Sequence, residues 1–373
     1  MKIDRIDVYQ VDLPYAQGTY RLSGGRTYTS FDATFVRVTT DCGLAGWGES
    51  TPFGGSYVGA HAKGVRAGLD DLAPAVLRLD PARLDRINDV MDEVLVGQLA
   101  AKTPIDVACW DILGQHTQMP VCDLLGGRIE GAVPVISSIG GDDPEAMRAN
   151  VARHRARGFL GHSIKIGASQ AEGGPDLDAE RIRACLADRT AQEWFLADAN
   201  GGLTAEHALR MLALVGPGAD FVLEAPCASW HETLSLRGRA RVPLLLDELI
   251  ESEADLIHAI RADACDGVGL KVSKQGGLTR MRRQREICRA AGLVVSIQDT
   301  VGSEVAFAAL LHCAQSTPRH MLRCALDTRA MVDRSVAAFD APLVAGGAVV
   351  PAAPGLGIAP DMAVLGAPVA TYA

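Results

Sequence analysis

Five short apolar segments of the sequence each end at one ionisable residue. They are Ser163-Ile164-Lys165, Leu196-Ala197-Asp198, Val222-Leu223-Glu224, Leu245-Leu246-Asp247 and Gly269-Leu270-Lys271. A helix-like segment follows each run before the next begins, which is typical of alternating β-strand and α-helix units. In a closed barrel of parallel strands, the carboxyl ends of all strands open into one mouth. The sequence therefore predicts that these five end residues meet at the mouth of a (β/α) barrel.

The residue types at these ends suggest a chemistry. Three carboxylates without a His or Cys neighbour, from Asp198, Glu224 and Asp247, suit a hard cation such as Mg²⁺. A metal ion there would withdraw charge from a substrate carboxylate, so that a proton on the adjacent carbon becomes removable. Lys165 and Lys271 are the candidate acid and base, because nearby positive charge disfavours the ammonium form. A single residue of this kind is more often a helix cap or a surface charge, but five successive units argue against coincidence.

The whole chain divides into three predicted regions, and the five segments lie in the second of them. Residues 1–130 combine strand patterns, such as Ile3 to Leu13 and Asp32 to Thr39, with helical periodicity from His61 to Gln118. Residues 131–335 would form the barrel, and residues 336–373 a tail rich in Gly, Pro and Ala that returns to the first region. The predicted fold is α/β: a TIM-type barrel of seven or eight β/α units, with an α+β capping domain formed by the N-terminal region and the tail.

Four further residues are candidates for binding a substrate. Tyr20 and Tyr57 lie on glycine-containing loops of the capping region, where each would offer an apolar face and a hydroxyl. Asp299 and Thr300 follow the predicted seventh strand, Leu293 to Gln298, and Asp299 would pair with a substrate ammonium. The ordinary alternatives are surface tyrosines on flexible loops and an aspartate that caps the following helix. The eighth strand is predicted at His320 to Cys324.

The composition restricts the partners and the compartment. With 48% hydrophobic and 22% charged residues among 373, the chain is an ordinary globular protein. A formal net charge of -9 without a basic cluster argues against nucleic acid or an anionic membrane as partner. Nine scattered cysteines without a Cys-x-x-Cys pair indicate free thiols. Since the segment Met1 to Val8 has no apolar signal core, we expect a cytoplasmic protein.

Several motifs resemble those of a known family. They are Gly46-Trp47-Gly48-Glu49, Ala108-Cys109-Trp110-Asp111, Leu124-Leu125-Gly126-Gly127 and Lys271-Val272-Ser273-Lys274-Gln275-Gly276-Gly277, together with the five strand ends. The chain resembles the enolase superfamily over nearly its full length, in the branch of the muconate-lactonizing and mandelate racemase-like enzymes. Within that branch it looks most like cis-3-hydroxy-L-proline dehydratases.

The resemblance implies a site and a substrate class. It implies Mg²⁺ on Asp198, Glu224 and Asp247, with Lys165 and Lys271 as the acid/base pair, and the superfamily's use of a Lys base with Mg²⁺ is a known example of such tuning. It also implies a small amino-acid substrate, held by the loops that carry Tyr20 and Tyr57 and by the strand end at Asp299 and Thr300, and a symmetric homo-oligomer. The chain departs from the pattern once, because it has Ser163-Ile164-Lys165 where many relatives have Lys-x-Lys.

Two reactions remain open within this family. A dehydratase would remove the Cα proton and expel the C3 hydroxyl of cis-3-hydroxy-L-proline to give 1-pyrroline-2-carboxylate, whereas an epimerase of proline, hydroxyproline or their betaines would reprotonate Cα from the opposite face. Aromatic faces usually hold a quaternary ammonium. Beyond Trp230 only Phe307, Phe339 and Tyr372 are aromatic, and none ends a predicted strand. The sequence therefore favours a secondary amine over a betaine.

Two functions of other classes also remain. A Schiff-base aldolase would use Lys165 or Lys271 as nucleophile, but the three carboxylates would then have no purpose, and sensitivity to EDTA separates the two cases. A non-catalytic barrel is the other alternative. It would show no Mg²⁺-dependent deuterium exchange with any carboxylic acid offered.

Overall fold

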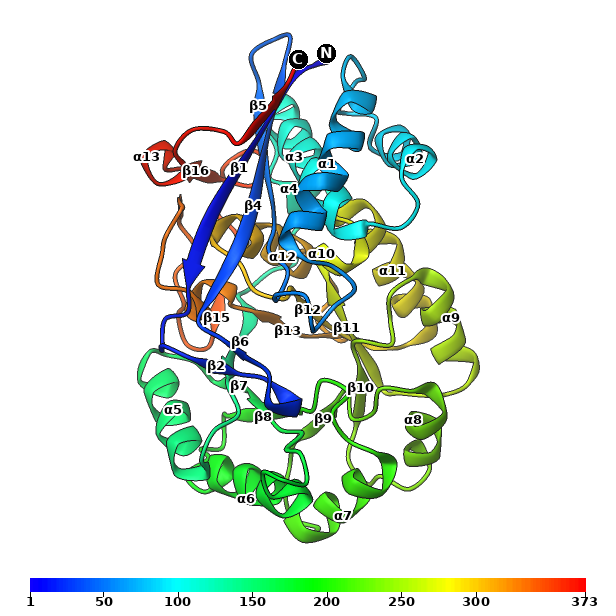
Figure 1. Cartoon of the computed structure of the whole chain (residues 1–373), viewed down its shortest axis with the longest axis vertical. Helices are drawn as coiled ribbons and strands as arrows, with labels where there is room; N and C mark the ends of the chain where they lie inside the picture. Colours follow the sequence, from blue (N-terminus) through cyan, green and yellow to red (C-terminus); the bar gives the residue numbers. More distant parts are fainter.

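The computed structural model describes residues 1–373 and contains a closed barrel of eight parallel strands. The barrel closes through pairing of its first and last strands, with Ala325 opposite Val135 (Figure 1). The strands are β6 (Val133–Ile139), β7 (Gly161–Lys165), β8 (Trp194–Asp198), β9 (Val222–Glu224), β10 (Leu244–Leu246), β11 (Gly267–Lys271), β12 (Val294–Gln298) and β13 (Leu322–Leu326). This arrangement confirms the predicted (β/α) barrel.

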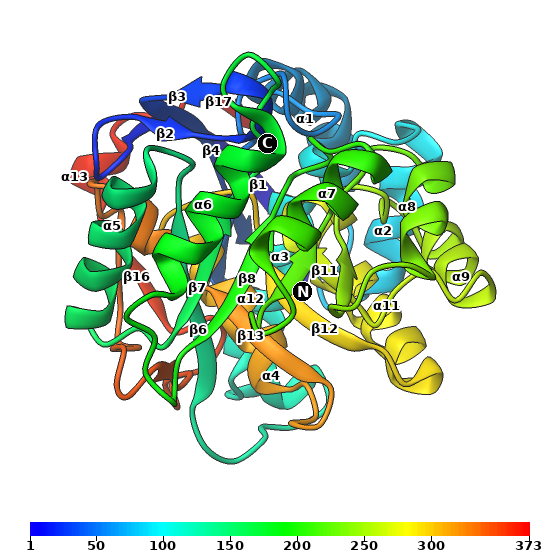
Figure 2. The same ribbon diagram turned by 90° about the horizontal axis from the view of Figure 1, so that it is seen from below.

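Helices surround the barrel on its outside, as the view from below shows (Figure 2). Several begin at a Ser or Thr whose hydroxyl accepts a hydrogen bond from a backbone N–H of the first turn, such as Thr204, Ser229 and Ser252. The helices are α5 (Pro144–Ala156), α6 (Gly174–Leu186), α7 (Ala205–Val215), α8 (Trp230–Arg237), α9 (Glu253–Arg261), α11 (Leu278–Ala291) and α12 (Glu304–Gln315). A short helix, α10 (Val272–Gln275), follows β11 directly.

The capping domain consists of a four-stranded antiparallel sheet and three helices. Its sheet has the order β17-β1-β4-β5, with β1 at Ile3–Pro14, β4 at Ser30–Thr40, β5 at Ala45–Ser50 and β17 at Ala370–Tyr372. The helices α1 (Ala62–Val76), α2 (Leu84–Val94) and α3 (Leu99–Thr117) bury apolar side chains against this sheet. Because β17 pairs with β1, the tail completes the capping domain, as predicted (Figure 1).

Two buried carboxylates join the capping domain to the barrel. Glu49, at the end of β5, accepts hydrogen bonds from the backbone N–H groups of Ser303 (3.0 Å) and Ala306 (3.0 Å) at the start of α12. Asp106, in α3, accepts hydrogen bonds from the side chain of Asn88 (2.7 Å) and from the backbone N–H of Thr279 (3.1 Å) in α11. These contacts fix the capping domain to helices α11 and α12 of the barrel, and from there the loops of the capping domain reach the barrel mouth.

One strand differs from its prediction by two residues. The eighth strand was predicted at His320 to Cys324, but β13 spans Leu322–Leu326. The backbone N–H groups of Met321 and Leu322 both donate to the carbonyl of Pro318, so a turn still occupies the positions where the strand was expected to start. All nine cysteines are free thiols. No helix of this chain combines the length and the apolar character that a bilayer crossing needs.

Candidate active site

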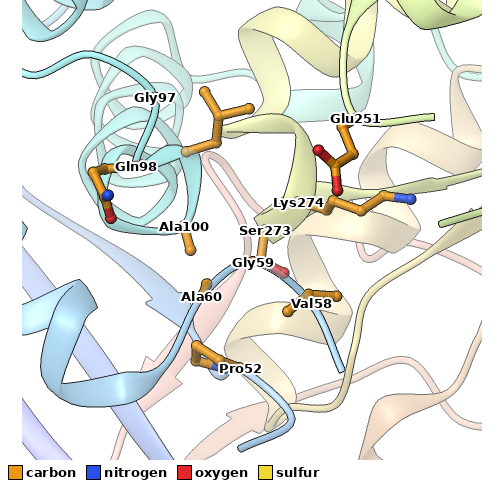
Figure 3. A pocket seen from close by; sticks show the side chains of 11 residues that line it. Pro52, Val58, Gly59, Ala60, Gly97, Gln98, Ala100, Glu251, Ser273 and Lys274 are labelled. Carbon is orange, nitrogen blue, oxygen red and sulfur yellow. The ribbon is translucent and has the colours of Figure 1, made fainter. Parts of the chain in front are cut away.

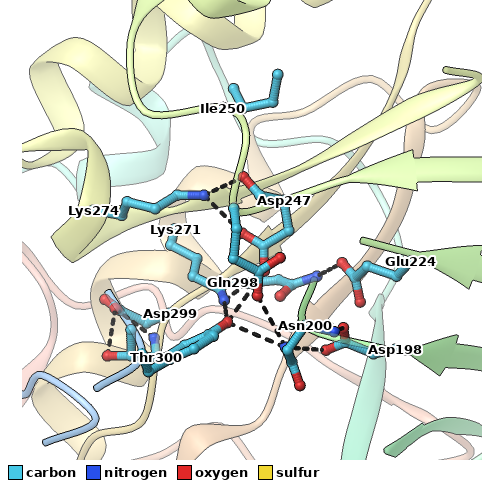
Figure 4. A network of polar contacts seen from close by, with 12 residues as sticks. Asp198, Asn200, Glu224, Asp247, Ile250, Lys271, Lys274, Gln298, Asp299 and Thr300 are labelled. Carbon is cyan, nitrogen blue, oxygen red and sulfur yellow. Dashed lines mark hydrogen bonds and ion pairs between the residues drawn. The ribbon is translucent and has the colours of Figure 1, made fainter. Parts of the chain in front are cut away.

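The five predicted end residues all lie at the mouth of the barrel. Lys165, Asp198, Glu224 and Lys271 are the last residues of β7, β8, β9 and β11, and Asp247 follows β10 by one position. Pairing in register places Lys165 beside Asp198 and Asp198 beside Glu224. All five are buried, with at most 9% of any residue exposed. The mouth therefore contains three carboxylates and the ammonium groups of Lys165 and Lys271, all shielded from solvent. Figure 4 shows Asp198, Glu224, Asp247 and Lys271.

The two lysines face each other across the mouth. Their strands, β7 and β11, are four positions apart in a closed barrel of eight, so they lie on opposite walls. The ammonium of Lys165 pairs with Asp198. The ammonium of Lys271 lies 2.5 Å from an oxygen of Asp247 and also donates to the hydroxyl of Tyr57. A small molecule bound between the walls would present one face to each lysine.

Burial and neighbouring charges shift the pKa of each group differently. Burial favours neutral lysine, but the carboxylates of Asp198 and Glu224 outweigh it and raise the pKa of Lys165. Burial together with the charges of Asp198 and Asp247 raises the pKa of Glu224 well above its ordinary value. Burial also acts on Asp247, but the ammonium groups of Lys271 and Lys274 prevail and lower its pKa. Asp247 is thus better compensated than Glu224.

The donor chemistry of the mouth fits an oxygen-seeking divalent cation. Glu224 is buried and accepts one hydrogen bond, from Gln298 (2.8 Å), but it has no cationic partner. A buried carboxylate without a counter-ion is costly, so a cation beside it would be stabilising. The three carboxylates do not form a preassembled cage in this structure, since lysines hold two of them. The set contains carboxylate oxygens and no sulfur or imidazole, which is the preference of Mg²⁺.

Two residues of the mouth were missed in the sequence. Lys274 donates from its ammonium to Asp247 Oδ1 (2.7 Å), and Gln298, the last residue of β12, holds Glu224. Both carried a usable signal. Gln298 is a polar residue at a predicted strand end, like the five that were chosen, and Lys274 lies in the motif that begins at Lys271.

The capping domain closes the mouth with aromatic side chains from two segments, residues 15–28 and 51–57, which together form a lid. Tyr20 and Tyr57, both predicted to bind substrate, line the enclosed cavity at the mouth together with Phe53. The Tyr20 hydroxyl hydrogen-bonds with Ser138 Oγ (2.7 Å), and the Tyr57 hydroxyl accepts a bond from Asn200 Nδ2 (3.3 Å) besides that from Lys271. The cavity measures only about 20 Å³, so a substrate can enter only if the loops that carry Tyr20, Phe53 and Tyr57 move.

These rings correct one step of the sequence argument. The preference for a secondary amine considered only the aromatic residues of the barrel segment beyond Trp230. The rings of Tyr20 and Phe53 lie 5.2 Å apart, and those of Phe53 and Tyr57 lie 5.8 Å apart. Aromatic faces therefore reach the mouth from the capping domain.

Asp299 and Thr300 lie at the cavity wall, but their polar groups already have partners. The carboxylate of Asp299 accepts hydrogen bonds from the backbone N–H groups of Ser273 (3.2 Å) and Thr300 (2.7 Å) and from the Ser273 hydroxyl. The hydroxyl of Thr300 donates to the carbonyl of Thr51 (2.7 Å), which belongs to the capping domain. Their contacts hold the loop after β12 in place and join it to the lid.

A second cavity, of about 190 Å³, lies beside the mouth between the capping domain and the barrel. Its lining includes Pro52, Val58, Gln98, Glu251 and Lys274 (Figure 3). Lys274 lines this cavity and also reaches Asp247 in the mouth.

Comparisons with known proteins agree with this geometry. Residues 18–126 match the mandelate racemase/muconate lactonizing enzyme N-terminal domain, and residues 146–364 match the enolase C-terminal domain-like model. The chain is 39% identical to cis-3-hydroxy-L-proline dehydratase of Roseibium aggregatum over 100% of both chains, and 28% identical to N-succinyl-L-Arg/Lys racemase of Bacillus cereus over 85% of both.

A solved structure from Roseovarius nubinhibens ISM, assigned to the mandelate racemase/muconate lactonizing enzymes and complexed with magnesium, is 65% identical. It superposes with a TM-score of 0.98 and covers 100% of both chains. A member of the enolase superfamily from the same organism, also complexed with magnesium, is 38% identical, covers 100% of this chain and 99% of its own, and has a TM-score of 0.91. The chain therefore belongs to the enolase superfamily, in its mandelate racemase/muconate lactonizing enzyme branch.

Proposed function

We propose that this enolase superfamily enzyme is a Mg²⁺-dependent dehydratase that converts cis-3-hydroxy-L-proline to 1-pyrroline-2-carboxylate. The observation that carries the proposal is the pair of buried lysines, Lys165 and Lys271, on opposite walls of a mouth that also contains three carboxylates. The full-length similarity to cis-3-hydroxy-L-proline dehydratase of Roseibium aggregatum supports the choice of substrate.

The proposed reaction needs one basic and one acidic group on opposite sides of the ring. In the cis isomer the carboxylate and the C3 hydroxyl share one ring face, so the Cα proton and the hydroxyl lie on opposite faces. One lysine takes the Cα proton, a double bond forms between Cα and C3, and the C3–O bond breaks as the other lysine protonates the hydroxyl, which leaves as water. The enamine that results tautomerises to 1-pyrroline-2-carboxylate.

The remaining residues of the mouth would hold the substrate for this step. Asp198, Glu224 and Asp247 would bind Mg²⁺, which when present withdraws charge from the substrate carboxylate and so acidifies the Cα proton. Apolar side chains at the base of the cavity, from Ile136 and Leu196, suit the carbon atoms of a small ring. Closure of the lid would exclude water from the reacting carbon.

Epimerisation of proline, hydroxyproline or a betaine is the second candidate. Two lysines on opposite walls equally suit removal of a proton from one face and return to the other. The rings of Tyr20, Phe53 and Tyr57 favour a ligand with an N-methylated ammonium, since aromatic faces attract such cations. One relative of this chain is a racemase and another is a dipeptide epimerase.

Proton NMR in D₂O with Mg²⁺ separates these candidates. The enzyme is offered cis-3-hydroxy-L-proline, and separately 4-hydroxyproline and its betaine. Loss of the C3 proton signal with growth of pyrroline carboxylate is the expected result. Deuterium at Cα with the hydroxyl retained, and a diastereomer accumulating, would establish the epimerase instead. Addition of EDTA should stop either reaction, whereas a Schiff-base aldolase would continue.

A further inference from the structure

Asp247 is held differently from the other two carboxylates of the mouth. Asp198 and Glu224 are the last residues of their strands and pair in register with each other. The strand before Asp247, β10, ends at Leu246, whose partner in β11 is Val268. Asp247 therefore lies outside the strand ladder, although only 1% of the residue is exposed. Another group has to fix its backbone and its side chain.

Lys274 is that group. Its ammonium donates to Asp247 Oδ1 (2.7 Å) and also to the backbone carbonyl of Asp247 (Figure 4). One nitrogen thus holds the main chain and the side chain of the same residue. Only 7% of the Lys274 side chain is exposed, so water does not compete strongly for these bonds. The other oxygen, Oδ2, is left to Lys271 and the mouth.

The turn after Asp247 is anchored to the same short helix. The backbone N–H of Ile250 donates to the carbonyl of Asp247 (2.9 Å), and Gln275 Nε2 donates to the carbonyl of Ile250 (2.9 Å). Gln275 is fixed in turn by Gln284 (2.8 Å). Helix α10 therefore holds both ends of the turn through consecutive residues, Lys274 and Gln275.

Lys271 cannot perform this task. As a proposed proton carrier it has to exchange partners between Asp247 and the substrate, whereas a residue that orients a ligand must stay in place. We propose that Lys274 is a positioning residue that fixes Asp247 with Oδ2 facing the mouth for Mg²⁺. This inference rests on the proposed function, because it takes Asp247 as a Mg²⁺ ligand.

The charge of Lys274 and its hydrogen bonds have opposite effects on Mg²⁺ binding. A positive charge close to a cation site repels the cation, so removal of the charge alone would tighten Mg²⁺ binding. Loss of a group that orients a metal ligand typically weakens metal affinity by about 10- to 100-fold. The sign of the change in affinity therefore distinguishes positioning from a purely electrostatic role.

Titration calorimetry with Mg²⁺ alone tests the proposal. We expect K274M to bind Mg²⁺ about 10- to 100-fold more weakly than the wild-type protein, and K274R, which keeps the donors, to restore most of the affinity. K274Q lacks the charge but is too short to hold both oxygens, so it should also bind more weakly. It serves as the test if K274M does not fold, which thermal melting without Mg²⁺ reveals.

The matched control is K102M, because Lys102 is also buried (1% exposed) and pairs with an aspartate, Asp92 (2.8 Å), but in the capping domain. It should lower thermal stability and leave Mg²⁺ affinity unchanged. Unchanged or tighter binding in folded K274M or K274Q would overturn the positioning role and leave the proposed function intact. A wild-type protein that binds no Mg²⁺ would overturn both.

Discussion

Removal of one hydroxyl, in Tyr57→Phe, should slow proton exchange on one face of the substrate and spare the other. The Tyr57 hydroxyl accepts a hydrogen bond from the ammonium of Lys271, and its ring lies 4.7 Å from that nitrogen. Phenylalanine keeps the ring contact and loses only the hydroxyl. A hydrogen bond to a charged group contributes about 1.5–3 kcal/mol, so the step served by Lys271 should slow by about tenfold to a hundredfold.

Deuterium exchange at Cα measures this effect without any leaving group. L-proline and D-proline present the Cα proton to opposite walls, and each is followed by proton NMR in D₂O with Mg²⁺. We expect Y57F to slow exchange with one enantiomer and to leave the other close to the wild-type rate. The control is Tyr28→Phe, since the Tyr28 hydroxyl bonds Ser56 Oγ (2.9 Å) at the exposed end of the same lid.

Two results would refute this reasoning. Equal slowing with both enantiomers would mean that Tyr57 acts on lid closure and not on Lys271. Wild-type rates with both would mean that the hydroxyl leaves Lys271 when substrate binds.

Three further predictions concern the other mouth residues and the junction with the capping domain. Lys165→Ala and Lys271→Ala should each abolish dehydration while Mg²⁺ still binds by calorimetry, and near-wild-type turnover in either variant would remove that lysine from the mechanism. Asp198→Asn should weaken Mg²⁺ binding, because an amide carries no charge, and an unchanged isotherm would exclude it as a ligand. Burial raises the pKa of Glu49 to about 7, against the opposing hydrogen bonds from Ser303. Because the folded-state pKa lies above the ordinary value of 4.5, protonation of Glu49 adds to the free energy of unfolding. This contribution, at most about 3 kcal/mol, is complete below pH 4.5 and is lost as the pH rises through 7. Urea unfolding should therefore show a smaller loss of stability over this range in E49Q than in the wild-type protein, and parallel curves would contradict the assignment.

The barrel could be predicted from the sequence because its signal repeats. Most strands are short apolar runs, and five of the eight end at a charged or polar side chain, as at Asp198 and Glu224. The first residue of a strand was predicted less well where a turn precedes the strand. The turn that follows Pro318 delays the start of β13 by two residues, and the number of residues that such a turn takes up is not visible in hydrophobic periodicity.

The details of the site depend on contacts between distant segments. The preference for a secondary amine considered only the aromatic residues beyond Trp230, although Phe53, from a loop of the capping domain, also reaches the barrel mouth. Nor does the sequence show that Asp299 already accepts hydrogen bonds from Ser273 and Thr300. Residue type can suggest that a side chain is able to bind a ligand. Only the packed structure reveals which of its atoms are already used.

The pairing of β17 with β1 has a consequence for the order of folding during synthesis. Domains generally fold as units, with the N-terminal one first. Here the strand that completes the first sheet, Ala370–Tyr372, follows the entire barrel in the sequence. A nascent chain therefore cannot finish its N-terminal sheet until the barrel has been translated. The edge of β1 that β17 covers must wait unpaired during that time, and truncations that remove β17 should disturb a domain whose other strands all precede the barrel.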